Sequence, residues 1–244
     1  MRCTRSNSGL RAIPKSALVV LLGWTGGAVD AMGYLVLYRL YTAQMSGNTL
    51  HLAVALGRHD LRVALERAAV IAAFIAGALF GALVIEIAKR RFPRAAFALT
   101  LGIEIVLLVT FWIVAAQASF APRADSATYF ALLALAAPAM AIQNVALRKV
   151  GGTVVHTTFV TGVIVVVCES LVNVVAARVF DGRRDAESEA ALRVLLPVYP
   201  AYLSGGLAAA LVFLARPVYA PSIGLVPLVG VWLYAAISRT PIFP

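Results

Sequence analysis

Apolar runs recur along nearly the whole chain, separated by short basic or polar stretches. Each run is about 20 residues long, which matches a bilayer core about 30 Å thick at a helix rise of about 1.5 Å per residue. Only 13% of the 244 residues are charged, whereas a soluble domain carries about 25%. Because the strands of a membrane barrel would be short and alternating, the pattern predicts an all-α, polytopic transmembrane helix bundle.

The net charge of +10 does not indicate a nucleic-acid partner. The basic residues fall in short clusters between apolar runs, as in loops at a membrane face. The tail of residues 1–15 contains Arg2, Arg5, Arg11 and Lys15. We therefore expect a cytoplasmic N-terminus. The long apolar run after this tail has no clear cleavage site, which favours an anchoring first helix over a signal peptide.

Residues 1–244 are expected to form a single integral membrane domain with about six to eight hydrophobic segments. The predicted segments are 16–38, 41–57, 64–88, 96–117, 127–147, 156–178, 194–215 and 219–237. Residues 181–193 are the strongly polar stretch between them, and we expect a loop there. The distribution of Lys and Arg fits either six or eight crossings. The sixth segment is long enough to span a bilayer, which favours eight.

The two halves of the chain, 16–117 and 127–237, resemble each other and predict an internal repeat. Three pairs of landmarks match in the same order: Asp30 with Gln143, Ser46-Gly47 with Thr161-Gly162, and the Ala73, Gly77, Gly81 stripe with Ala201, Gly205, Ala209. The extra residues of 181–193 account for the larger offset of the last pair. Transporter folds are often built from such repeats. Four crossings per half would make the halves parallel, and three would make them inverted.

Polar side chains within the apolar segments are the candidate functional residues. Such a side chain costs about 2.5–3.5 kcal/mol at the bilayer centre on insertion scales. The candidate substrate- or ion-binding residues are Asp30, Ser46, Asn48, Gln143, Asn144, Thr161 and Glu169. Ser46 and Thr161 each precede a glycine, where a helix start would offer free N–H groups. A carboxyl from one half and an amide from the other would suit a cation or proton beside a neutral or zwitterionic solute.

A structural interpretation stands beside each functional one. A buried carboxyl such as Asp30 can hold helices in register, and a hydroxyl-glycine pair can be an ordinary helix start. Glu104 and His51 are weaker candidates for a direct role. Gly77, Gly81 and Gly205 indicate close helix packing, because small residues let two helix backbones approach.

No enzyme, metal or cofactor pattern is present in the sequence. The chain has no phosphate loop, no zinc-binding His-Glu-x-x-His and no nucleophile elbow. Two cysteines, Cys3 and Cys168, indicate no disulfide framework. The expected partners are the lipid bilayer and a small solute or cation, and a homo-oligomer is compatible with the sequence.

Two motifs carry a resemblance to a known family. They are Gly27-Ala28-Val29-Asp30-Ala31 with Thr42-Ala43-Gln44-Met45-Ser46-Gly47-Asn48-Thr49, and Ala141-Ile142-Gln143-Asn144 with Thr157-Thr158-Phe159-Val160-Thr161-Gly162. Over roughly 16–237 the chain resembles the YoaK-like bacterial membrane proteins, with Ser46 standing where the family has Thr. The resemblance implies a membrane location and leaves the substrate open, because the family is a domain of unknown function.

Taken together, these features favour a small-molecule or ion transporter, with proton coupling through Asp30 as the sharper form of the hypothesis. The alternative is a non-transporting scaffold or partner subunit whose buried polar residues only hold helices together.

Overall fold

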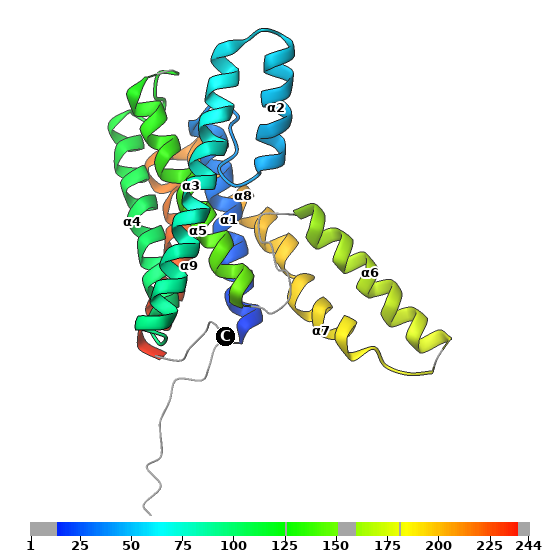
Figure 1. Cartoon of the computed structure of the whole chain (residues 1–244). Coiled ribbons are helices and arrows are strands. Elements are labelled where there is room, and N and C mark those ends of the chain that lie inside the picture. The colour runs from blue at the N-terminus through cyan, green and yellow to red at the C-terminus, as the bar shows by residue number, and fades with distance from the viewer. Residues whose placement is uncertain (1–13, 125, 151–159, 181, 239–244) are drawn as a thin grey trace, which may run out of the picture.

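Figure 1 shows a computed structural model of the chain, which describes residues 14–124, 126–150, 160–180 and 182–238. The regular structure in these ranges is helical. The helices are α1 (Lys15–Val36), α2 (Met45–Gly57), α3 (Leu61–Arg91), α4 (Ala96–Gln117), α5 (Ala127–Val150), α6 (Val160–Val179), α7 (Ala186–Leu195), α8 (Val198–Ala215), the short 3₁₀ helix η1 (Pro217–Tyr219) and α9 (Ser222–Ser238). Most of the predicted basic tail and the start of the predicted sixth segment, 156–159, lie outside the described residues.

Seven helices of the described chain are long and apolar enough to cross a membrane. They span Ser16–Val36, Leu61–Arg91, Ala96–Gln117, Ala127–Leu147, Val160–Val179, Ala186–Ala215 and Pro217–Ser238. The prediction of an all-α, polytopic membrane protein is thus confirmed. The predicted span at 41–57 is wrong, and with it the eight crossings. The helix there, α2, has 13 residues and is too short to cross a bilayer.

The predicted loop at 181–193 is also partly wrong, because α7 begins inside it at Ala186. Asp185 starts this helix: its Oδ1 accepts a hydrogen bond from the Ser188 N–H at 3.1 Å. That bond lowers the pKa of Asp185. The sequence pattern missed α7 because its apolar face is short and its first turn carries Glu187 and Glu189, a placement that favours a helix start.

The long helices run up and down a bundle, and the direction of each can be followed in Figure 1. The start of α1, the turn between α3 and α4, and the ends of α5 and α9 lie at one end of the bundle. The turn between α2 and α3 lies at the other end. Consequently α1 and α5 run in opposite directions. Helices α6 and α7 pack against each other at the side of the bundle.

Two close helix crossings hold the bundle together, α1 with α8 and α3 with α5. A Cβ added at Gly205 of α8 would overlap the backbone carbonyl of Trp24 on α1. A Cβ added at Gly77 of α3 would overlap the backbone of Pro138 on α5, and one at Gly81 would lie 3.2 Å from the Ile142 Cα. All three glycines therefore lie where two helix backbones approach closely, and their packing role stays a prediction.

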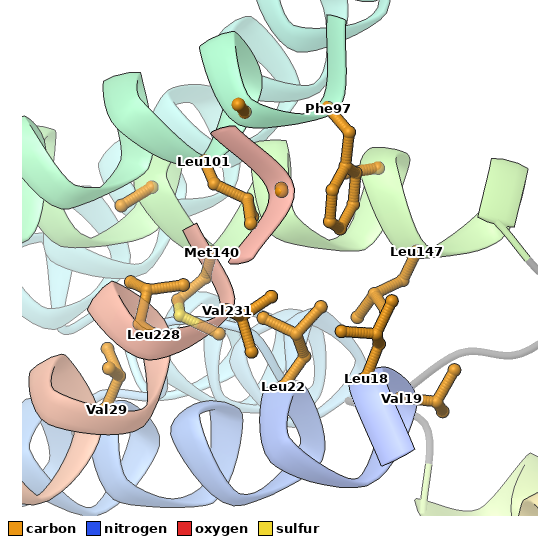
Figure 2. Packing of buried hydrophobic residues seen from close by; sticks show 14 of the residues in the cluster. Leu18, Val19, Leu22, Val29, Phe97, Leu101, Met140, Leu147, Leu228 and Val231 are labelled. Carbon is orange, nitrogen blue, oxygen red and sulfur yellow. The ribbon is translucent and has the colours of Figure 1, made fainter. Parts of the chain in front are cut away.

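A hydrophobic core lies where α1, α4, α5 and α9 meet. In Figure 2 the side chains of Leu22, Leu101, Met140, Leu228 and Val231 gather between these helices. All five are almost completely buried. A polar side chain on one of these helix faces therefore lies in apolar surroundings.

Candidate functional site

Asp30 of α1 is buried and holds the loop that follows its own helix. Its Oδ1 accepts three hydrogen bonds, from the Thr42 N–H at 3.0 Å, the Thr42 hydroxyl at 2.8 Å and the Ala43 N–H at 2.9 Å. This loop contains two consecutive non-glycine residues with left-handed backbone, Tyr38 (φ 52°) and Arg39 (φ 64°). Such residues cost about 1–3 kcal/mol each and persist only where their surroundings fix them. The Asp30 carboxylate supplies part of that fixation.

The second oxygen of the same carboxylate joins α1 to α8. Tyr202 donates its hydroxyl to Asp30 Oδ2 at 2.6 Å, and Gln44 Nε2 donates to the Tyr202 oxygen at 2.8 Å. The chain Gln44–Tyr202–Asp30 therefore links the loop before α2, α8 and α1. We refer to these residues with Thr42 as the Asp30 network. It is a closed set of hydrogen bonds with every Asp30 oxygen satisfied.

Asn48 is fully buried and holds the same loop from the side of α2. Its Nδ2 donates to the Tyr41 carbonyl at 2.7 Å, and its Oδ1 accepts from the Tyr41 N–H at 3.3 Å. Arg67 of α3 donates to the Arg39 carbonyl at 3.2 Å. The loop is thus anchored by α1, α2, α3 and α8 together.

The other predicted site residues do not gather around Asp30. Ser46 and Thr161 lie in the first turns of α2 and α6, as the predicted helix starts require, but their side chains are exposed. Glu169 is exposed on α6. Gln143 is fully buried on α5 and donates from Nε2 to the Leu22 carbonyl of α1 at 2.7 Å, with Asn144 half-buried beside it. Leu22 precedes Asp30 by about two turns, or about 12 Å along α1.

Glu104 of α4 has surroundings unlike those of Asp30. It is fully buried, and within the described chain neither Oε1 nor Oε2 has a hydrogen-bond partner. It lies on one face of α4 with Leu101 one turn before it and Leu108 one turn after it, and both belong to the hydrophobic core. The carboxyl group therefore points into that core.

Gln143 faces the same core from α5. Met140 and Leu147, at i−3 and i+4 from it, are members of the core, and Gln143 Oε1 has no partner among the described residues. An unmade bond to a buried polar atom costs about 1–3 kcal/mol and more for a charged group. Two polar side chains whose oxygens have no partner among the described residues thus face one apolar core, and we take Glu104 and Gln143 as the candidate site.

A small cavity lies one turn from Glu104, between α1, α4 and α9. Its volume is about 20 Å³, and its lining includes Val29, Leu108, Phe111 and Leu225. A cavity of this size has room for about one water molecule. This cavity therefore leaves no space for a solute.

Sequence reasoning identified Asp30, Asn48 and Gln143 as buried polar residues but missed Tyr202. That tyrosine lies in an apolar segment among other aromatic residues, and its distance of 172 residues from Asp30 hides the pairing. Its position one turn before Gly205, in the helix predicted to pack closely, was the available signal. Glu104 is the lone carboxyl of its apolar segment, and a lone carboxyl shows nothing about its partners in the fold.

Membrane-length helices around buried polar side chains define a multi-pass α-helical membrane protein. A family model described as a protein of unknown function (DUF1275) matches residues 18–236, so the chain belongs to that family. The curated "UPF0700 transmembrane protein YoaK" of Bacillus subtilis (strain 168) is 27% identical over 157 residues, which cover 64% of this chain and 67% of that protein. No solved structure matches the chain.

Proposed function

We propose that this protein is a proton-coupled carrier of a small solute, and not an enzyme, in which Glu104 takes up and releases the proton. The observation that supports it is that both Glu104 oxygens lie in the hydrophobic core without a hydrogen-bond partner among the described residues. A carboxyl with no hydrogen bond contributes nothing to holding helices in register. A structural role explains Asp30, but it leaves Glu104 with a cost and no compensating contact.

A carboxyl in these surroundings responds strongly to hydration. An ionised carboxylate in a dry interior costs far more than the neutral acid, whereas in water the ion is the ordinary form. Opening of the core to water on one side would therefore release a proton from Glu104, and closing would favour its uptake. Gln143 faces the same core, its Oε1 has no partner in the described part of the chain, and it is the second polar group available to a proton or a bound solute.

We further propose that the chain is an inverted repeat with six full crossings, α1, α3, α4, α5, α7–α8 and α9. Contacts between the halves support it: α1 of the first half packs on α8 and α9 of the second, and α5 of the second half packs on α3 and α4 of the first. The glycine contacts agree with the sequence match, in which Gly77 corresponds to Gly205. Gly77 contacts Pro138, and Gly205 contacts Trp24. The offset that relates Asp30 to Gln143 makes Thr25, the neighbour of Trp24, the counterpart of Pro138.

Such a repeat provides a means of alternating access, because the unit of α1, α8 and α9 can rock against the unit of α3, α4 and α5 around a central site. The Asp30 network then acts as a latch between the units: Asp30 and Tyr202 of the first unit hold the loop before α2, and α2 packs on α3 of the second. We place the N-terminus on the cytoplasmic side of a bacterial inner membrane, from the basic tail and the bacterial relative.

The second candidate function is a non-transporting scaffold or partner subunit. The complete bonding of Asp30 favours it, because a fully satisfied carboxylate has no free oxygen for a ligand. In a scaffold the core would stay closed, so Glu104 would not exchange a proton with water.

Uptake into proteoliposomes discriminates the two candidates. With purified protein, an inward proton gradient and a panel of labelled amino acids, sugars, organic cations and nucleosides, the carrier accumulates one class of solute. Glu104→Gln should lose accumulation driven by the gradient and keep exchange of solute for solute. Glu187→Gln, an exposed glutamate on α7, is the matched control and should behave as the wild type. Absence of uptake for every class, with equal behaviour of the two variants, would favour the scaffold.

A further inference from the structure

A long groove runs along the outer surface of the bundle between α4 and α9. Its volume is about 1130 Å³. Ala98, Gly102 and Val106 of α4 form one side, and Trp232 and Ala236 of α9 form the other. Each of these residues belongs to a candidate membrane span, so the groove lies at the depth of lipid chains.

The groove ends at a basic turn. Arg94, which lies between α3 and α4, is exposed and forms part of the lining. Lys89, Arg90 and Arg91 precede it in the last turn of α3. Arg90 pairs with Glu86 at 2.8 Å, but in the described chain no carboxylate lies within ion-pair distance of Lys89, Arg91 or Arg94. Unpaired cations thus border an apolar groove at one end of the bundle.

Two further features favour an anion at this end of the groove. Helix α4 begins there, and its N-cap residue Ala95 provides no side-chain hydrogen bond to the first turn. The positive end of the helix dipole is therefore left without a negative partner. In addition, Trp232 lies against Gly102, where an added Cβ would be 3.3 Å from the indole Nε1. That N–H has no acceptor among the described residues, so it is available to an ester carbonyl.

We propose that this groove binds an anionic phospholipid. The phosphate lies on Arg94 and Arg91 at the start of α4, an ester carbonyl accepts from the Trp232 Nε1–H, and an acyl chain follows Gly102 and Val106 between the two helices. Basic pockets between membrane helices are a recognised setting for acidic headgroups.

Charge distinguishes this occupant from a second copy of the chain. Two copies inserted in the same orientation would bring the same basic turn to the same level of the membrane. Like charges at such an interface repel, whereas an acidic headgroup neutralises them. The groove opens to the outside of the bundle, so a lipid can enter it sideways.

Native mass spectrometry of the full-length protein with defined lipids tests the proposal. The protein is titrated with phosphatidylglycerol or phosphatidylcholine of identical chains, and bound lipid is counted. We expect preferential retention of phosphatidylglycerol, reduced about five-fold by Arg94→Gln, since one basic residue near a membrane surface contributes about this factor. Arg58→Gln, an exposed arginine at the opposite end of the bundle, is the matched control and should leave retention unchanged.

A second variant blocks the groove itself. Ala236→Leu adds bulk at an exposed lining position, so the variant should fold normally and lose retention of both lipids. Equal retention of the two lipids by the wild type, or equal losses in Arg94→Gln and Arg58→Gln, would overturn the proposal. So would a dimer in the wild type that Ala236→Leu dissociates without any loss of lipid.

Discussion

Asp30 and Glu104 are both buried carboxyl groups in apolar helices, yet their surroundings are opposite. Asp30 accepts bonds on both oxygens from the loop before α2 and from Tyr202. Glu104 accepts none within the described chain. In the sequence each is a single acidic residue in an apolar run, so only the neighbouring motifs distinguish the two as candidate functional residues. Only the positions of distant helices decide that Asp30 is anchored and Glu104 is not.

Removal of the Tyr202 hydroxyl should loosen the Asp30 network. Tyr202→Phe leaves Asp30 Oδ2 and Gln44 Nε2 each without this partner, and a buried group left unpaired costs about 1–3 kcal/mol. We expect a lower melting temperature in detergent. Tyr199→Phe, an exposed tyrosine on the same helix, is the matched control and should melt as the wild type. Equal melting temperatures for both variants would show that the Tyr202 bond does not hold the loop.

At the scale of helices, sequence patterns predicted the membrane-length elements well, because about 20 apolar residues in a row leave little choice of structure. The pattern at 41–57 misled, since α2 is as apolar as a span but only 13 residues long. The preceding loop limits its length: Asp30 of α1 holds Thr42 and Asn48 of α2 holds Tyr41 in non-helical backbone, and the helix begins after them at Met45. Such an anchor is a tertiary effect and is invisible in local composition.

The close crossing of α1 and α8 gives an element-level prediction. Gly205→Ala would force a methyl group into the Trp24 carbonyl, which belongs to a helix backbone and cannot turn away. Overpacking of this kind costs about 1–3 kcal/mol, so the variant should melt at a lower temperature. Gly230→Ala in α9 is the matched control: nothing lies within 4 Å of the added atom, and its stability should be unchanged or slightly higher. A wild-type melting temperature for Gly205→Ala would refute the close crossing.

At the scale of the whole molecule, the number of crossings decides which loops share a side of the membrane. The eight crossings favoured by the sequence would place residue 58 with the N-terminus and residue 92 on the opposite side. The arrangement in Figure 1 reverses both, because the turn between α2 and α3 lies opposite the start of α1. The sequence could not settle this point, since the basic residues fit either count.

Labelling of single cysteines in intact cells tests this topology. In a background where Cys3 and Cys168 are replaced by serine, Arg58→Cys should react with an impermeant maleimide. Phe92→Cys should react only after the cells are permeabilised. Both positions are exposed, so accessibility within the fold is not limiting. The reverse pattern would restore eight crossings and exclude the inverted repeat.

Carbodiimide labelling tests, without a known substrate, whether Glu104 exchanges a proton with water during a conformational cycle. Dicyclohexylcarbodiimide is apolar and adds to carboxyl groups in their protonated form. In proteoliposomes, peptide mass spectrometry should find the adduct on Glu104, formed more slowly as the pH rises, and should find Asp30 unmodified. An unmodified Glu104 under conditions that label the exposed Glu169 would contradict the account, because the core would then never open.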